Sequence, residues 1–258
     1  MGIFIGSTPV TPNFGSTAIQ SVYYGSIPVY TRGTKIESLS LGSIVKIPLA
    51  GIPTEFMVVN QGVPGDSSAY GPGCDGCWIL AKDIYTKIKA LDTSAQRGYT
   101  NTDLYTYLTD TFPLLVPEDT RAKLNTATIP YRAGNSGTTV SGGTSGLQAM
   151  FFLLSKTELG GTKDYTGNVI EGAKLDYFES PDSSETANAL RVAYYQGAAT
   201  QWWTRTPKAG GYQMVTIGTT GSLSSNVGSG SPLTNTLGIR PCMVVKKGTL
   251  VDADGNLV

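Results

Sequence analysis

The sequence predicts an α+β domain made of many short elements, preceded by a short all-β segment. Charged residues make up only 15% of the 258 residues, whereas Gly, Pro, Ser and Thr are abundant, which favours turns over long helices. A few segments show helical periodicity, and the C-terminal third is typical of strands. Short helices around irregular antiparallel strands define the α+β class.

A repeat of nine to ten residues occupies the beginning of the chain. Its three copies start near Ile5, Phe14 and Tyr24, and each continues with Gly-Ser and a second short apolar run. Each copy predicts a hairpin that is too small to bury its own apolar face. We therefore expect residues 1–35 to be an attachment or oligomerisation segment, or else a meander folded onto the following domain.

Residues 36–258 are the second predicted unit, and its strands follow from short apolar or alternating runs. In the first part we predict strands at residues 43–48, 55–60, 78–80 and 128–131, and a buried strand at 149–154. In the C-terminal part we predict strands at residues 201–205, 212–217, 221–227 and 239–246. A final hairpin is predicted to turn at Asp254-Gly255.

Helical spacing and capping residues predict the helices. They cover residues 83–91, residues 101–113, a short stretch after Pro117, and residues 185–194. The first has Ile84, Ile88 and Leu91 at i, i+4 and i+7, with lysines on its solvent face. The second is predicted to start at Asn101 as N-cap and to end at Pro113. In the last, Ala189, Leu190 and Ala193 are expected to face the core.

Composition argues against several functional classes. Nineteen basic residues balance nineteen acidic ones, so no bulk charge attracts nucleic acid. The first positive charge is Arg32, which argues against a signal peptide, and no apolar run approaches the ~20 residues that span a bilayer. We expect a protein that is made and kept soluble, with no membrane insertion.

The absence of histidine and the few cysteines argue against catalysis. Without histidine, Ser-His and Cys-His pairs and histidine metal ligands are excluded. Cys74 and Cys77 form one pair and Cys242 stands alone, so a four-ligand zinc site and a disulfide framework are both disfavoured. We predict packing roles for the cysteines, no cofactor, no metal site and no enzymatic activity.

An uncharged segment is the main functional clue. Residues 209–239 contain no charged side chain, and 17 of these 31 residues are Gly, Ser or Thr. The segment lies between the motif Trp202-Trp203-Thr204-Arg205-Thr206-Pro207 and the motif Gly238-Ile239-Arg240-Pro241. A stiff frame that holds small polar side chains is typical of recognition surfaces, because aromatic groups fix positions while small polar groups adapt their hydrogen bonds.

Four residues of these motifs are predicted to be scaffold anchors: Trp202, Trp203, Arg205 and Arg240. Adjacent strand residues point to opposite faces, so we expect one tryptophan in the core and the other under the following loop. A guanidinium has five donors, so each arginine can hold several loop carbonyls.

A series of motifs resembles an uncharacterised domain that is common in phages and bacteria of the gut. The motifs are Trp78-Ile79-Leu80, Tyr107-Leu108, Ile129-Pro130-Tyr131-Arg132, Phe152-Leu153-Leu154-Ser155 with Glu158, and the two motifs around the uncharged segment. The resemblance covers roughly residues 36–258. It implies a C-type lectin-like fold of the kind used by variable proteins of diversity-generating retroelements, with a variable-type region at about residues 204–240. The N-terminal repeat resembles segments at the start of phage tail-associated proteins.

The resemblance implies a phage tail adhesin, or a retroelement-diversified variable protein, that recognises a host cell-surface protein or glycan. A virion location after synthesis in the bacterial cytoplasm, and a homo-oligomer, by analogy a trimer, belong to this expectation. The ligand face is predicted to comprise Tyr212, Gln213, Thr216, Thr219, Thr220, Ser222, Ser224, Ser225, Asn226, Ser229, Ser231, Thr234 and Asn235.

Two alternatives stay open. The first is a structural tail protein whose C-terminal loops pack against neighbours. The second is an oxidoreductase like the formylglycine-generating enzymes, which resemble the same fold family and use a copper-binding cysteine pair. Only Cys242 lies in the C-terminal half, so that pair has no match here.

Overall fold

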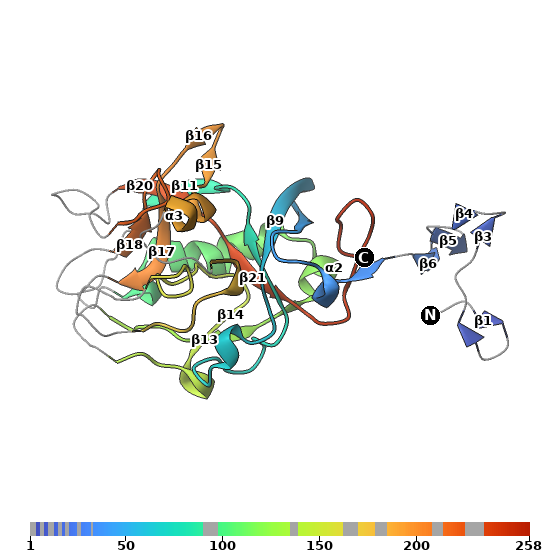
Figure 1. Cartoon of the computed structure of the whole chain (residues 1–258), viewed down its shortest axis with the longest axis horizontal. Helices are drawn as coiled ribbons and strands as arrows, with labels where there is room; N and C mark the ends of the chain where they lie inside the picture. The colour runs from blue at the N-terminus through green and yellow to red at the C-terminus, as the bar shows by residue number, and fades with distance from the viewer. Residues whose placement is uncertain are drawn as a thin grey trace.

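Two five-stranded sheets and a few short helices make up the main domain of the computed structural model (Figure 1). The structure describes residues 33–89, 98–134, 139–161, 170–178, 185–207, 214–224 and 235–258, together with the backbone of short strands between residues 4 and 31. Strands predominate and the helices are short, which confirms the α+β prediction. Within the described residues, no helix has the length and apolarity that crossing a membrane requires.

The first sheet is antiparallel throughout and has the order β12-β21-β10-β9-β8. Its strands are β8 (Ile44–Leu49), β9 (Ile52–Gln61), β10 (Cys77–Ala81), β12 (Leu124–Asn125) and β21 (Cys242–Val245). Every second residue of β8 is buried, as its alternating sequence predicts. The strands predicted at residues 43–48 and 55–60 are confirmed, and they pair with each other.

The second sheet has the order β11-β20-β17-β18-β19, and its strands are β11 (Thr86–Lys89), β17 (Trp202–Pro207), β18 (Met214–Ile217), β19 (Leu223–Ser224) and β20 (Thr236–Ile239). Strand β17 is central. It runs parallel to β20 and antiparallel to β18. The predicted single strand at 239–246 is wrong, because the chain leaves this sheet at Arg240-Pro241 and enters the first sheet as β21. Pro241 has no N–H to continue a ladder.

Three smaller strand pairs also belong to the main domain. They are β13 (Ala127–Ile129) with β14 (Leu147–Ala149), β15 (Tyr194–Tyr195) with β16 (Ala198–Ala199), and β7 (Thr34–Lys35) with β22 (Leu250–Val251). Because β7 pairs with β22, the chain joins the main domain just before the predicted boundary at residue 35. In the predicted buried strand at 149–154, Phe152 pairs with Cys242 as an isolated bridge, and residues 151–154 are buried.

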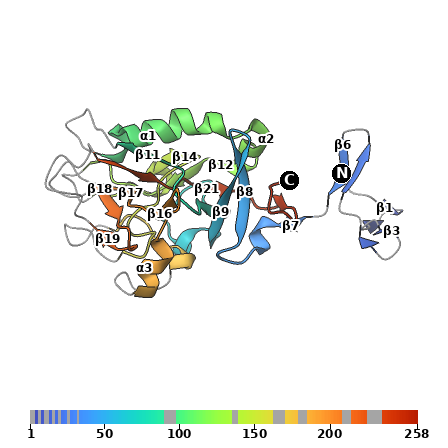
Figure 2. The ribbon, with the colours of Figure 1, turned by 90° about the horizontal axis from the view of Figure 1, so that it is seen from above.

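The N-terminal repeat forms three separate hairpins, as predicted. They are β1 (Phe4–Ile5) with β2 (Thr8–Pro9), β3 (Asn13–Phe14) with β4 (Thr17–Ala18), and β5 (Ser21–Tyr24) with β6 (Ile27–Thr31). The Gly-Ser turns lie outside the described residues. Both views place these hairpins at the end of the molecule beyond β7, whereas β17 and β18 lie at the opposite end (Figures 1 and 2).

One long helical run and two short helices accompany the sheets. The run consists of α1 (Asp103–Thr106), the π-helix η4 (Tyr107–Thr111) and the 3₁₀ helix η5 (Phe112–Leu115). The other helices are α2 (Glu118–Arg121) and α3 (Glu185–Arg191), and the 3₁₀ turns are η1 (Ile36–Ser38), η2 (Pro64–Asp66), η3 (Tyr99–Asn101), η6 (Gly143–Ser145) and η7 (Asp176–Phe178). In Figure 2 the run that begins with α1 and the helix α3 lie on opposite sides of the sheets.

The predicted helices at 101–113, after Pro117 and at 185–194 exist, with local corrections. Thr102 rather than Asn101 is the N-cap of α1, since its hydroxyl accepts a hydrogen bond from the Tyr105 amide. Pro113 does not end the run, because it occupies the first turn of η5, where its missing N–H is tolerated. In α3 the predicted inward-facing Ala189 is exposed, and Arg191 is buried instead.

The predicted helix at 83–91 is wrong, because residues 86–89 form strand β11. Residues four apart lie on one side of a strand as well as on one face of a helix, so Ile84 and Ile88 fit both. The pairing decides the outcome: β11 lies antiparallel to β20. There a Cβ on Gly238 would come within 2.6 Å of the Ile84 side chain, so glycine permits this close packing. Leu91 lies outside the described residues.

Candidate functional site: a buried arginine frame below an exposed turn

We call the buried residues Trp202, Trp203, Arg205, Arg191 and Arg240 the frame. Strand β17 contributes the first three of them, and both of its tryptophans are fully buried. The Trp202 indole N–H donates to the Arg191 carbonyl at 3.1 Å, and the Trp203 indole N–H donates to the Ile88 carbonyl at 3.1 Å. Both rings belong to the hydrophobic core. The loop that follows β17 begins at residue 208, outside the described residues, so the prediction that one tryptophan lies under it stays a prediction. Both faces of β17 are covered by other segments of the described domain, so alternation along the strand does not expose either ring.

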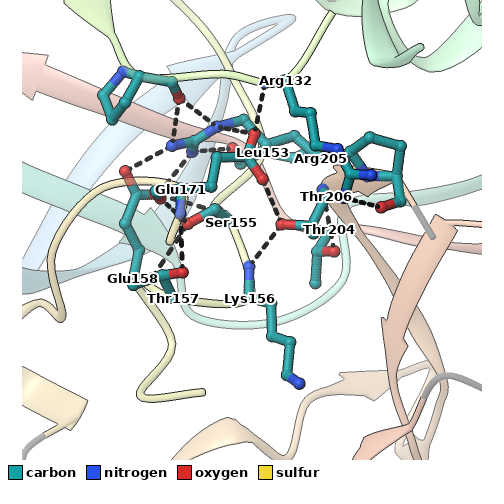
Figure 3. A network of polar contacts seen from close by, with 12 residues as sticks. Arg132, Leu153, Ser155, Lys156, Thr157, Glu158, Glu171, Thr204, Arg205 and Thr206 are labelled. Atoms are coloured by element: carbon teal, nitrogen blue, oxygen red, sulfur yellow. Dashed lines mark hydrogen bonds and ion pairs between the residues drawn. The ribbon is translucent and has the colours of Figure 1, made fainter. Parts of the chain in front are cut away.

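Arg205 is fully buried, and its guanidinium contacts segments that are far apart in the sequence (Figure 3). Its guanidinium donates to the Pro130 carbonyl at 3.0 and 3.2 Å and to the Leu153 carbonyl at 2.8 Å. It also makes a two-pronged pair with Glu158, at 2.5 and 2.7 Å, and its Nε lies 3.4 Å from Glu171. A planar fork that faces a carboxylate is the strongest geometry of this kind.

Hydroxyl groups and main-chain amides extend the contacts of the two carboxylates. Thr206 Oγ1 donates to Glu171 at 2.6 Å and accepts from the Lys156 amide at 2.8 Å. The Tyr70 hydroxyl donates to Glu158 at 3.0 Å. We call Arg205, Glu158, Glu171, Thr206 and Tyr70 the buried arginine network.

The charges of this network set the direction of three pKa shifts. Burial raises the pKa of Glu171, although the positive charge of Arg205 opposes the shift. Burial alone would lower the pKa of Arg205, but the carboxylate of Glu158 outweighs burial and the pKa is raised. Burial and the negative charge of Glu158 both raise the pKa of Tyr70. Arg205 therefore stays charged and Tyr70 stays a neutral donor at neutral pH.

Arg240 is the second predicted anchor, and its surroundings are less polar. It is buried, its Nε donates to the Ala81 carbonyl and its Nη2 to the Lys82 carbonyl, each at 2.9 Å. Its guanidinium lies 4.8 Å from the centre of the Trp202 ring, a cation–π contact. Among the described atoms Nη1 has no hydrogen-bond partner. Burial lowers the pKa of Arg240 to about 10, which still leaves it protonated at neutral pH.

The predicted ligand residues fall into three groups. Thr219 and Thr220 are exposed, and Ser222 and Asn235 are partly exposed. Thr216 is fully buried and its hydroxyl accepts from the Gln201 side chain at 2.8 Å, so its predicted outward position is wrong. The remaining candidates lie outside the described residues, or in the case of Ser224 have only their backbone described: Tyr212, Gln213, Ser224, Ser225, Asn226, Ser229, Ser231 and Thr234.

A tight turn between β18 and β19 presents Thr219 and Thr220. The Gly218 amide donates to the Ser222 carbonyl at 2.8 Å, which closes the turn. The Gly221 carbonyl accepts from Arg191 Nε at 2.9 Å, so the buried Arg191 ties the turn to α3. Gly221 has φ +79°, and a Cβ there would lie 1.8 Å from the Asn188 carbonyl oxygen. Only glycine fits this contact.

Strand direction places the described candidates at one edge of the second sheet. Trp202 starts β17 and pairs with Ile217, which ends β18, so the turn follows at that edge. The same edge holds Thr236, which starts β20, and Asn235 precedes it. Since β18 and β20 flank β17, the turn that follows β18 and Asn235, which precedes β20, are two strand spacings apart, about 10 Å. Met214, which Gln213 precedes in the chain, starts β18 at the opposite edge, where it pairs with Pro207.

Several buried charged residues of the frame were not predicted as site residues. Glu171 and Arg191 were missed entirely, and Arg132 and Glu158 entered only through motifs. A usable signal exists for Arg132 and Glu158, because each closely follows a predicted strand. Nothing local distinguishes Glu171 or Arg191 from solvent-exposed charges.

The three cysteines pack in the core as free thiols. Burial raises the pKa of Cys74 and of Cys77 to about 12, and it also raises the pKa of Cys242. Such thiols stay protonated and unreactive at neutral pH. No group of three or more Cys, Asp or Glu with the geometry of a metal site occurs in the described part of the chain.

Fold and site together define a strand-rich α+β domain in which buried arginines support an exposed, uncharged turn. Residues 75–247 match the model of the family described as Domain of unknown function (DUF6273). This match covers more than half of the chain, so the protein belongs to that family. It includes the whole of the second sheet and most of the buried arginine network. Comparisons with curated proteins and with solved structures find no match.

Proposed function

We propose that the protein is a receptor-binding protein whose C-terminal loops recognise a host cell-surface protein or glycan. The observation that carries the proposal is the contrast between the buried frame and the turn at its edge. The frame is held by Trp202, Trp203, Arg191 and Arg205, all fully buried, whereas Thr219 and Thr220 are exposed and uncharged. A turn fixed by contacts beneath it loses little entropy when it binds a ligand.

The frame also makes the turn tolerant of sequence change. Arg191 holds the turn through the main-chain carbonyl of Gly221, not through a turn side chain. The side chains of Thr219 and Thr220 therefore contribute little to the fold. This separation is what a variable protein of a diversity-generating retroelement requires, and it supports the proposal of a variable-type region at about residues 204–240. A C-type lectin-like fold is part of the same proposal.

The arrangement of the chain supports a phage tail location. The hairpins β1–β6 lie at the opposite end of the molecule from β17 and β18 (Figures 1 and 2). Each hairpin is a two-stranded sheet with no third strand among the described residues, and two-stranded hairpins are marginally stable alone. In the proposal these hairpins attach the protein to the tail or join copies into a homo-oligomer, by analogy a trimer, which multiplies weak binding by avidity.

Binding rather than catalysis is the proposed activity. The described thiols are buried and protonated, and Tyr70 and Arg205 of the buried network are occupied by structural hydrogen bonds. The network serves to position loops.

Whole-cell binding tests the proposal. We would compare labelled wild type, the double variant Thr219→Ala/Thr220→Ala, and a matched control with two exposed threonines of the helical run replaced, Thr106→Ala/Thr111→Ala, on a panel of gut bacterial strains. The turn variant is expected to change which strains are bound while its melting temperature stays within about 2 °C of wild type, as exposed substitutions usually do. Unchanged strain selection in the turn variant, or an equal change in the control, would contradict the proposal.

A further inference from the structure

A polar hollow of about 300 Å³ lies away from the exposed turn, between the start of β9 and the segment that connects β10 to β11. This volume is at the lower end of small-molecule sites. Its wall includes Thr54, Glu55, Lys82, Asp83, Ile84 and Tyr85. None of these residues belongs to the predicted ligand face.

The main chain of this wall is fixed on all sides. The Lys82 amide donates to the Glu55 carbonyl at 3.0 Å, and the Tyr85 amide donates to the Ile239 carbonyl at 3.0 Å. The Ile84 amide donates to the Tyr194 carbonyl at 3.0 Å. The Arg240 side chain also donates to the Lys82 carbonyl. These hydrogen bonds pre-organise the backbone of the hollow's wall.

The side chains supply both donors and acceptors in fixed positions. Lys82 Nζ pairs with Glu55 at 2.6 Å, and each side chain is nearly half exposed, so each keeps hydrogen-bonding capacity toward solvent. Asp83 is exposed and uses Oδ1 to accept the Tyr194 amide at 3.0 Å. The ring of Tyr85 is held edge-to-face against Phe112, with centroids 5.5 Å apart.

This chemistry favours a neutral, hydroxyl-rich ligand. Two carboxylates face one ammonium in the wall, and the nearby buried guanidinium of Arg240 attracts Asp83, so the charges balance and favour neither an anion nor a cation. A protein partner needs about 800 Å² of surface on each side, far more than this hollow presents. A sugar has hydroxyls for the charged groups and an apolar face for the tyrosine ring.

We propose that this hollow is a second binding site, and that it takes one end of a neutral saccharide. Glu55 and Asp83 accept hydrogen bonds from sugar hydroxyls, Lys82 donates to them, and the ring of Tyr85 packs against the sugar. The site is separate from the turn at Thr219 and Thr220, and it does not depend on the proposed receptor-binding role of that turn.

Saturation-transfer NMR on the full-length protein tests the site. The probes are glucose, galactose, mannose, N-acetylglucosamine, maltose and lactose, with glucuronic acid as an anionic comparison. The test variant is Lys82→Met, which keeps an unbranched side chain one atom shorter and removes the charge. The matched control is Lys247→Met, because Lys247 forms a similar half-exposed pair with Asp75 at 2.5 Å outside the hollow. Exposed pairs of this kind contribute at most about 1 kcal/mol, so both variants should fold.

We expect transfer to at least one neutral sugar, and affinity for it roughly 10-fold lower in Lys82→Met, since hydrogen bonds to charged groups are worth about this much. The control variant and Thr219→Ala/Thr220→Ala should bind the sugar like wild type. The site is refuted if no neutral sugar receives transfer, if glucuronic acid binds more strongly, or if Lys82→Met binds unchanged. Equal loss in the turn variant would also refute a separate site. Failure of the cell-binding experiment above would leave this result standing.

Discussion

Replacing Arg205 with methionine is the sharpest test of the buried arginine network. The substitution replaces the charged side chain with an unbranched apolar one. It leaves Glu158 and Glu171 buried without the guanidinium. It also leaves the Pro130 and Leu153 carbonyls without their donor. Removing one partner of a buried pair costs about 3–5 kcal/mol, and each orphaned acceptor adds about 1 kcal/mol. We expect a loss on the order of 5 kcal/mol in the free energy of unfolding near pH 7.

The stability of the Arg205→Met variant should depend on pH, and Glu171 sets the direction of that dependence. Burial raises the pKa of Glu171 in the folded protein, and the charge of Arg205 opposes that shift. Without Arg205 the folded-state pKa should rise further above the unfolded value. The folded state then binds its proton more tightly, so stability increases as the pH falls from neutral through the raised pKa toward the unfolded value. Arg205→Met should therefore recover part of its loss in mild acid, and more steeply than wild type.

Urea unfolding is the assay, followed by the fluorescence of the three buried tryptophans, Trp78, Trp202 and Trp203. The double variant Arg205→Met/Glu171→Gln removes one uncompensated charge and should be more stable than Arg205→Met near pH 7. If Arg205→Met is too unstable to fold, Arg205→Lys, which keeps a charge but loses the fork, replaces it in the comparison. A loss below about 1 kcal/mol, or a pH profile identical to wild type, would refute the reasoning.

Three further predictions concern local structure. Gly221→Ala should lower the free energy of unfolding by more than about 2 kcal/mol in a urea titration, because its φ is +79° and its Cβ would lie 1.8 Å from the Asn188 carbonyl oxygen. Ala50, at the exposed tip of the β8–β9 hairpin, has φ +50°, so Ala50→Asn should raise the melting temperature by about 2–4 °C, and a fall would contradict the predicted strain. The three thiols should resist Ellman's reagent near pH 8 and react fully after denaturation, since burial raises the pKa of Cys74 and Cys77 to about 12; rapid labelling of the folded protein would show that they are accessible.

Local features of the fold were predictable because neighbouring residues determine them. The alternation in residues 44–49 specifies which side of β8 is buried, and the strand pairs at 44–49 and 52–61 follow from one short turn. The start of α1 was predicted within one residue, because a capping hydroxyl acts over a single turn. The N-terminal hairpins were predictable for the same reason, since each involves fewer than a dozen consecutive residues.

Features that depend on distant partners were not predictable. Residues 83–91 have a spacing that fits a helix and a strand, and the pairing of β11 with β20, about 150 residues later in the chain, made the choice. The two tryptophans are adjacent in β17, yet both are buried, and their indole N–H groups find acceptors in two segments far apart in the sequence, at Arg191 and at Ile88. A strand pattern does not reveal whether one face or both will be covered.

The candidate site, like the fold, was predictable only in part. An uncharged segment between two rigid motifs is visible in the sequence, and so is the choice of Arg205 and Arg240 as residues with many donors. Their partners were not visible: Glu158 lies 47 residues before Arg205, and Glu171 lies 35 residues before Thr206. The edge of the sheet at which Thr219 lies, and the burial of Thr216, depend on strand direction, which composition does not encode.

The amino-acid sequence by itself therefore determined the class of fold, most local elements and the neutral character of the C-terminal segment, since these depend on short-range geometry and composition. Only the tertiary structure decided which charges are buried together, that both faces of β18 are covered and where the polar hollow beside Glu55 and Lys82 lies. These features arise when segments far apart in the chain exclude water from one another, and that exclusion is a property of the packed domain as a whole.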